Sequence, residues 1–287
     1  MLLAPEFLSE LEHFQLRGRR RLAGSLAGEH RSPRYGGSID FADARPYNVG
    51  DDYRRIDYNL LARLDQLVVR LYEADDDVSV RLLIDTTASM AVGDKLGQAK
   101  RVAAALGFVT LVRRDSLTVH TFPAGRRSRS PRFIGRNAVG SLFKHVEGLL
   151  PEGRSDMVTP VMDLLAQPGL RGQTVLISDL LAPDWEAALR RLPSRGDDLT
   201  VVHVLADDDL RPGAVGEVDL VDIETGHRVA VSLSAAVAAA HRERMDGWRA
   251  DVAGRCRHIG AGYIEIGAQD DIRDAFRRAW RAAGVLR

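Results

Sequence analysis

The sequence of 287 residues has a single cysteine, no long hydrophobic run and no excess of charge of either sign. One thiol, Cys256, cannot form an internal disulfide, and it excludes zinc or iron–sulfur sites that are built from several cysteines. The apolar stretch at residues 102–112 is shorter than the roughly 20 residues that span a bilayer, so it predicts a buried helix. Because 40 Lys and Arg balance 40 Asp and Glu, the chain is not a uniformly basic binder of polyanions.

The composition is otherwise that of an ordinary globular protein. Hydrophobic residues make up 45% and charged residues 28%, which excludes the low-hydropathy, high-charge signature of disorder. The first residues carry Glu6, Glu10 and Glu12 ahead of a basic run, the reverse of the order in a secretory signal. We therefore expect a cytoplasmic protein that does not enter the membrane.

The pattern of the chain changes near residue 77. Residues 24–65 form a polar stretch without strong helical periodicity, whereas strands and helices alternate from residue 78 onward. We predict strands at residues 78–84, 116–122, 174–178, 199–205 and 262–266, and helices at residues 95–114, 139–150, 158–166, 184–192, 234–255 and 270–283. Continuous apolar strands that alternate with helices predict an α/β fold with a doubly wound, mainly parallel sheet of the Rossmann type.

This pattern divides the chain into two parts. We expect residues 1–77 to be an N-terminal segment, irregular or β, that packs on the sheet domain, and residues 78–287 to be that domain. A β-hairpin insertion, structural or lid-like, is predicted at about residues 216–233, where Glu224-Thr225-Gly226 separates two strands. Charges of both signs interleave between Phe41 and Arg63, which predicts an internal salt-bridge network; a partner-docking face is the alternative.

Two aspartates directly follow predicted strands. Asp85 opens the run Asp85-Thr86-Thr87-Ala88-Ser89, and Asp179 follows the strand at residues 174–178. Ligands of open α/β sheets bind beyond the carboxyl ends of the strands. Carboxylate and hydroxyl oxygens without imidazole or thiolate suit Mg²⁺, Mn²⁺ or Ca²⁺. In the alternative interpretation these aspartates cap helices or accept hydrogen bonds from loop amides.

At these residues the chain resembles a von Willebrand factor A domain. That fold carries a metal-ion-dependent adhesion site, written Asp-x-Ser-x-Ser after the first strand, with a Thr in a later Gly-containing loop and an Asp after the fourth strand. The resemblance implies that a divalent cation, Mg²⁺ first, is held by Asp85, Thr87, Ser89, Ser155 and Asp179. Thr159 is an alternative to Ser155.

A second set of motifs extends along the chain and resembles the bacterial family named domain of unknown function 58. The motifs are Gly28-Glu29-His30-Arg31-Ser32, Tyr35-Gly36-Gly37-Ser38, Phe41, Arg45-Pro46-Tyr47, Gly50-Asp51-Asp52, Arg54-Arg55-Ile56-Asp57-Tyr58, Ala62-Arg63 and the hairpin run from Asp219 to Gly226. Tyr58 stands where family members commonly carry Trp. The resemblance implies a partner, a MoxR-type AAA+ ATPase, with which the family is thought to act in chaperone-like assembly or activation of other proteins.

The motifs together favour a non-enzymatic, metal-dependent interaction module, whose cation receives a carboxylate from a protein partner. A phosphatase of the aspartyl-phosphate type needs a second carboxylate two residues after the nucleophile, and Thr87 stands there. A metal-dependent hydrolase that uses the same oxygen cluster stays open, although no base is evident.

Nucleic-acid binding is the other alternative. Arg-rich runs at residues 17–34 and 113–136 are basic, but they lack the interleaved aromatic residues of a single-strand platform. An acidic protein partner or a solvated surface is the favoured use of these arginines.

Overall fold

The computed structural model describes residues 2–14, 40–47, 56–64, 66–73, 79–122, 129–167, 172–211 and 216–280. The described residues fall into two compact units, one made of residues 2–14 and 79–280, the other of residues between 40 and 73. The motifs at residues 28–38 and 50–55 and the Arg-rich run at residues 17–34 lie outside the described residues. Packing of residues 1–77 on the sheet domain stays a prediction.

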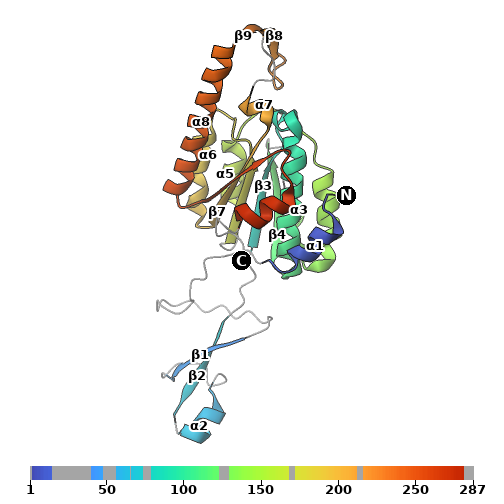
Figure 1. The fold of residues 1–287 in the computed structure, drawn as a ribbon. Helices are drawn as coiled ribbons and strands as arrows, with labels where there is room; N and C mark the ends of the chain where they lie inside the picture. The colour runs from blue at the N-terminus through green and yellow to red at the C-terminus, as the bar shows by residue number, and fades with distance from the viewer. Residues whose placement is uncertain are drawn as a thin grey trace. The chain divides into compact units, whose positions relative to one another are not determined.

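A six-stranded sheet forms the centre of the larger unit (Figure 1). In spatial order its strands are β10 (Gly262–Gly267), β7 (Asp198–Leu205), β6 (Gly172–Ser178), β3 (Ser79–Asp85), β4 (Ser116–Phe122) and β5 (Phe133–Ile134). The first five are parallel, and β5 pairs antiparallel with β4. Strand β3 lies between β4 and β6, so the chain changes direction across the sheet there. The carboxyl ends of β3 and β6 therefore flank the switch point at which such sheets bind ligands.

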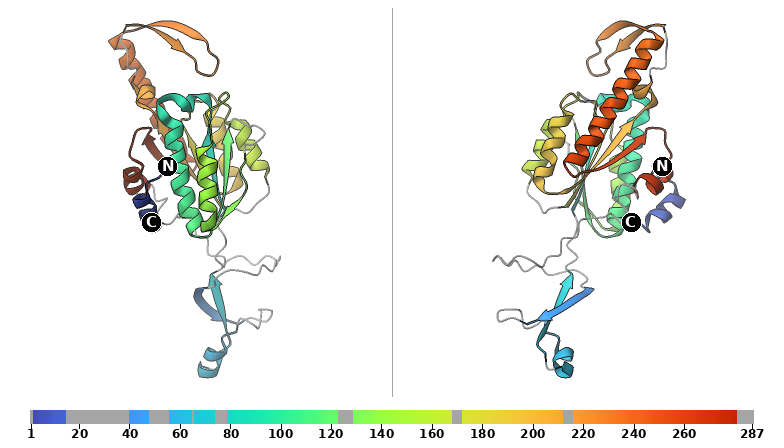
Figure 2. Two further views of the ribbon diagram at one scale, coloured as in Figure 1. Left: turned by 90° about the vertical axis from the view of Figure 1, so that its right-hand side faces the viewer. Right: turned by 60° about the vertical axis from the view of Figure 1, so that its left-hand side comes forward.

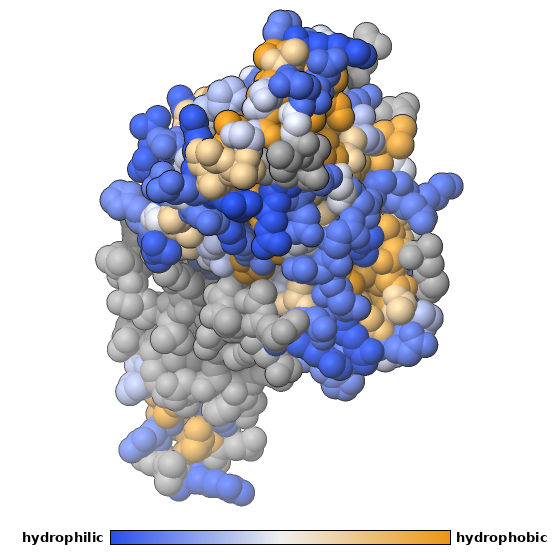
Figure 3. Space-filling model, turned by 45° about the horizontal axis from the view of Figure 1, so that its top comes forward, coloured by the Kyte–Doolittle hydropathy of each residue, from blue (hydrophilic) through white to orange (hydrophobic). Residues whose placement is uncertain are grey.

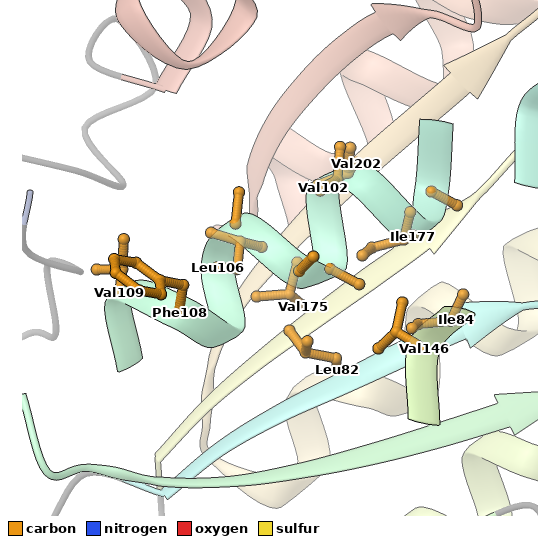
Figure 4. Close-up of a cluster of buried hydrophobic side chains, with 14 of the residues drawn as sticks. Leu82, Ile84, Val102, Leu106, Phe108, Val109, Val146, Val175, Ile177 and Val202 are labelled. Atoms are coloured by element: carbon orange, nitrogen blue, oxygen red, sulfur yellow. The ribbon is translucent and has the colours of Figure 1, made fainter. Parts of the chain in front are cut away.

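One face of the sheet is covered by α3 (Lys95–Val112) and α4 (Val139–Glu147). Helix α3 is apolar around most of its circumference and is buried along most of its length, as expected of a helix enclosed by protein. Figure 4 shows Leu82 and Ile84 of β3 directed toward Val102 and Leu106 of α3, with Val146 of α4 beside them. Fully burying such side chains contributes roughly 1.5–3 kcal/mol each.

The opposite face packs against α5 (Val158–Ala166), α6 (Trp185–Arg191) and α8 (Ala235–His258). Leu83 of β3 points to this side, between Leu82 and Ile84 on the other. Strands that are apolar on both faces are the sequence signature of a parallel sheet covered by helices. The predicted doubly wound α/β fold is confirmed (Figure 2).

Helix α1 (Pro5–Leu11) belongs to the larger unit. Its Phe7 and Leu11 are buried in the same cluster as α3. The ring of Phe7 meets Phe276 edge-on at 5.7 Å. Phe276 and Trp280 stack at 4.7 Å within a π-helical turn that follows α9 (Ile272–Ala275). Within the described residues, which end at Trp280, the helix predicted at residues 270–283 therefore begins at Ile272 and is irregular.

The predicted hairpin is present as β8 (Gly216–Val221) and β9 (Arg228–Leu233). It projects beyond the sheet, next to the start of α8 (Figure 2). Ser234 caps α8 because its hydroxyl accepts the amide of Val237 at 3.2 Å. Both strands of the hairpin are largely exposed, so it is an appendage and not a part of the core.

The smaller unit contains an antiparallel pair, β1 (Asp40–Pro46) and β2 (Val68–Glu73), and the helix α2 (Tyr58–Leu64). Asp57 is buried and its carboxylate accepts the amide of Leu60 at 3.2 Å, which caps α2. The salt-bridge network predicted between residues 41 and 63 stays a prediction. Across the described parts of both units, no helix is at once long and apolar enough to cross a membrane.

His120 in β4 is a buried histidine whose surroundings disfavour its charged form. Its exposure is 6%, and burial, followed by the charges of Arg129, Arg81 and Arg195, lowers its pKa to about 4. The unfolded chain takes up this proton near pH 6.5, whereas the folded chain resists it until about pH 4. The contribution of neutral His120 to the free energy of unfolding is therefore fully present above pH 6.5 and is lost as the pH falls toward 4.

We expect His120 to account for a loss of up to about 3 kcal/mol in the free energy of unfolding between pH 6.5 and 4. The variant His120→Gln should show a flatter acid dependence in urea unfolding. The exposed His227 provides the control, since His227→Gln should leave the dependence unchanged. An acid dependence in His120→Gln as steep as in the parent would contradict this account.

Candidate metal centre

Asp85 is the last residue of β3, and its carboxylate is enclosed by hydrogen-bond donors. One oxygen, Oδ1, accepts the Thr87 amide at 2.9 Å and the Thr87 hydroxyl at 2.7 Å. The other, Oδ2, accepts the Ser178 hydroxyl at 2.5 Å from the end of β6. The side chain is only 2% exposed. These bonds hold the carboxylate at the switch point of the sheet.

Two hydroxyls adjoin this carboxylate. The Oγ1 of Thr87 and the Oγ of Ser89 lie 3.0 Å apart. Thr87 precedes the short helix η2 (Ala88–Asp94), of which Ser89 is the second residue. The Asp-x-Thr-x-Ser run thus turns alternate side chains to the same side, as the spacing predicts.

The loop that carries Ser155 is tied to the same region by its backbone. The amide of Ala88 donates to the carbonyl of Gly153 at 3.1 Å, and the amide of Glu152 donates to the carbonyl of Thr86 at 2.7 Å. Ser155 itself is half-buried. Thr159 lies exposed in the first turn of α5, and Ser155 as the hydroxyl ligand stays a prediction.

Asp179 directly follows β6 and is 2% exposed. Its Oδ1 accepts the Leu181 amide at 3.1 Å. Between them Leu180 has φ 53°, a left-handed conformation that is rare without glycine. The Ser178 hydroxyl stabilises it by accepting the Leu180 amide at 2.9 Å. Strained backbone of this kind is concentrated at functional sites.

Lys95 is a partner of Asp179 that the sequence did not reveal. Its Nζ donates to Asp179 Oδ2 at 2.8 Å and to Asp209 at 3.0 Å, and its side chain is 1% exposed. Burial lowers the pKa of Lys95, but the two carboxylates outweigh burial, so its pKa lies above the ordinary value. Asp209 is held in place by the Ala206 amide at 2.9 Å.

His203 supports the backbone of Asp179. A carbonyl can only accept, so His203 Nε2 donates to the Asp179 carbonyl at 3.0 Å, and Nδ1 faces the Tyr263 hydroxyl at 2.8 Å. Burial lowers the pKa of His203 to about 4. The ring is therefore neutral near pH 7 and acts as a structural support.

The charges of this region do not cancel. Lys95 pairs with Asp179 and Asp209, so these three ionised side chains sum to one negative charge, and Asp85 adds a second when it is ionised. Burial, and after it the charge of Asp179, raise the pKa of Asp85 to about 7 against the opposing hydrogen bonds of Ser178 and Thr87. A bound divalent cation would favour the ionised form of Asp85.

The donor set fits a hard cation. It offers two carboxylates and hydroxyls and no imidazole or thiolate ligand, which is the preference of Mg²⁺, Mn²⁺ and Ca²⁺. Among the described residues, no group of three or more His, Cys, Asp and Glu side chains is placed to hold a metal, so the hydroxyls of Thr87, Ser89 and Ser155 are essential to the hypothesis. Metal binding itself stays a prediction.

Two arginines of the predicted basic run at residues 113–136 contact the N-terminal segment of the larger unit. Arg136 forms an ion pair with Glu12 at 2.5 Å, and Arg113 donates to the carbonyl of Phe14 at 3.4 Å. These contacts give part of the run a structural role. Asp209, the last of three consecutive aspartates at residues 207–209, is the partner of Lys95.

A family model described as "Protein of unknown function DUF58" matches residues 43–250. The chain belongs to this family. Uncharacterized proteins of Mycobacterium bovis and Mycobacterium tuberculosis are each 28% identical over 275 residues, which is 93% of this chain and 86% of the relative. An uncharacterized protein of Mycobacterium avium is 30% identical over 148 residues, or 50% of this chain and 87% of its own. The family membership predicted from the motifs is confirmed.

Two crystal structures show a weaker likeness to this DUF58 protein. One is the conserved hypothetical protein BatB from Bacteroides thetaiotaomicron, with 16% identity and a TM-score of 0.43. The other is an aerotolerance-related membrane protein from Bacteroides fragilis, with 19% identity and the same TM-score. Each match covers 72% of this chain and 98% of the other. At this TM-score the likeness supports no statement about function.

The buried ion triad around Lys95 yields a prediction. Lys95→Met should cost about 3–5 kcal/mol in the free energy of unfolding, because it leaves Asp179 and Asp209 buried without their cation. Lys100→Met, on the same helix, should cost less than about 1 kcal/mol, since Lys100 bonds the exposed carbonyl of Glu147. Urea unfolding of both variants measures the difference. Equal losses would show that the triad does not hold the site together.

Proposed function

We propose that this DUF58 protein is a non-enzymatic, metal-dependent protein-interaction module. Asp85, Thr87, Ser89, Ser155 and Asp179 would hold one divalent cation, Mg²⁺ first, with Mn²⁺ or Ca²⁺ as substitutes. The proposal rests on one observation above all: two buried aspartates at adjacent strand ends, Asp85 held by amide and hydroxyl donors and Asp179 by Lys95, with the hydroxyls of Thr87 and Ser89 beside Asp85.

Each residue has a distinct task in this proposal. Asp85 and Asp179 supply the charge that attracts a divalent cation, and Thr87 and Ser89 supply neutral oxygens next to Asp85. Ser178 and Lys95 hold the two carboxylates in place. Bound there, the cation supplies an electrostatic anchor for a carboxylate of a protein partner.

The finer assignments follow the sequence motifs. The arrangement of Asp85, Thr87, Ser89, Ser155 and Asp179 matches the adhesion site of von Willebrand factor A domains in order along the chain. The motifs shared with the DUF58 family support a MoxR-type AAA+ ATPase as the partner and an adaptor or co-chaperone role in the cytoplasm. We propose no reaction, because Thr87 bonds to Asp85 where an aspartyl-phosphate phosphatase needs a carboxylic acid.

Replacement of Asp85 tests the proposal. Asp85→Asn keeps the shape of the side chain and removes a buried charge, so the fold should persist, while the affinity for Mn²⁺ should fall at least about tenfold through loss of a charged ligand. Titration calorimetry with Mn²⁺ measures this change, with Asp208→Asn at an exposed position as the control. Mg²⁺-dependent capture of the ATPase should be lost in parallel.

Two results would contradict the proposal. One is a parent protein that shows no saturable Mn²⁺ binding. The other is Mn²⁺ affinity in Asp85→Asn equal to that of the parent. Circular dichroism of both variants verifies that the fold is retained.

A further inference from the structure

The turn of the hairpin contacts the loop of the candidate metal centre through one carboxylate. The Ser155 amide donates to both Glu224 oxygens, at 3.1 Å to Oε1 and 3.0 Å to Oε2. The Ser155 hydroxyl also donates to Oε1 in a short hydrogen bond. A backbone amide and a hydroxyl on one residue thus form a ready receptor for a carboxylate, and a charged acceptor makes such bonds about twice as strong as neutral ones.

The hairpin turn is built to present Glu224. Asp222 accepts the amides of Glu224 and Thr225 at 2.8 and 3.2 Å, and the Thr225 hydroxyl at 2.6 Å. The Thr225 hydrogen bond is the first cause that lowers the pKa of Asp222, and the charge of Arg154 in the loop contributes. Between residues 221 and 230, Glu224 is half-buried and the other residues are exposed.

Little apolar burial fastens the hairpin to the sheet domain. Leu220, Val221, Ile223 and Val229 are 51%, 52%, 50% and 48% exposed. Figure 3 shows apolar surface at this end of the molecule. Hydrogen bonds of Glu224 therefore provide much of the attachment of the turn to the loop that carries Ser155. Exposed apolar surface of this kind is typical of interaction sites.

We propose that Ser155 is the carboxylate-binding subsite of the partner interface, and that Glu224 occupies it until a Glu or Asp side chain of the partner takes its place. This inference rests on the proposed function, for which it names the position of the partner's carboxylate. Exchange of one carboxylate for another preserves the hydrogen bonds of the Ser155 amide and hydroxyl, so the exchange leaves no buried donor unsatisfied. The released hairpin can then offer Leu220, Val221 and Ile223 to the same partner.

The inference is tested with propionate, which copies the end of a glutamate side chain. In full-length Glu224→Ala, propionate should shift the Ser155 amide resonance in a saturable manner, while the parent shows at least about tenfold weaker binding because its own Glu224 competes. Propionamide, the neutral analogue, should cause no such shift. Glu217→Ala, an exposed glutamate of the same hairpin, is the matched control and should behave as the parent.

A second variant separates the hydroxyl from the rest of the loop. In the Glu224→Ala background, Ser155→Ala should weaken propionate binding about tenfold through loss of one hydrogen bond to a charged group. Trypsin cleavage after the exposed Arg228 should also accelerate in Glu224→Ala and not in Glu217→Ala. Absence of a saturable shift in Glu224→Ala, or propionate binding by the parent of equal strength, overturns the inference.

These measurements are made with a chelator present, so they do not depend on metal binding. Propionate binding without Mn²⁺ binding would support the Ser155 subsite and contradict the metal-dependent function. Mn²⁺ binding without propionate binding in Glu224→Ala would retain the metal centre and overturn the subsite.

Discussion

The repulsion between two buried carboxylates is the constraint on which the rest of the site depends. Parallel pairing places Ile84 of β3 beside Ile177 of β6, so Asp85, one residue after Ile84, and Asp179, two residues after Ile177, come to the same edge of the sheet. Desolvation makes the negative charge of Asp85 costly, and the nearby charge of Asp179 adds to that cost. The Ser178 hydroxyl and the Lys95 ammonium offset part of it. The remaining charge is what a divalent cation would neutralise.

Ser155 connects this charge to the surface. Its loop is fixed to the Asp85 loop by two backbone hydrogen bonds, and its amide and hydroxyl already receive a carboxylate from the hairpin. The hairpin is a small attachment with exposed apolar side chains, so it can leave the loop without disturbing the core. The rigid sheet and the detachable hairpin together suit a surface that is closed in the free protein and open to an acidic partner.

Local sequence patterns sufficed for most of the fold. The apolar run before Asp85 and the helix at residues 158–166 were predictable because a short stretch of sequence shows their hydrophobic pattern. Helix α5 begins and ends at the predicted residues. The strand β5 escaped prediction because two residues carry no periodic signal. The π-helical turn at Phe276 and Trp280 depends on the burial of both rings in the core cluster, which no local pattern encodes.

For the site, as for the fold, the sequence predicted only what depends on residues that are close together along the chain. Asp85, Thr87 and Ser89 follow from spacing within one loop, and Asp179 follows from its place after a strand. Lys95 bonds Asp179 and Asp209 across 84 and 114 residues, and Glu224 reaches Ser155 across 69. Such pairings depend on the folded topology, so the sequence identified Glu224 only as a turn residue.

Anomalous diffraction from crystals soaked in Mn²⁺ tests the central claim, that a divalent cation binds here, most directly. We predict an anomalous peak among the oxygens of Asp85, Thr87, Ser89, Ser155 and Asp179. A fully ordered site without such a peak would contradict the claim.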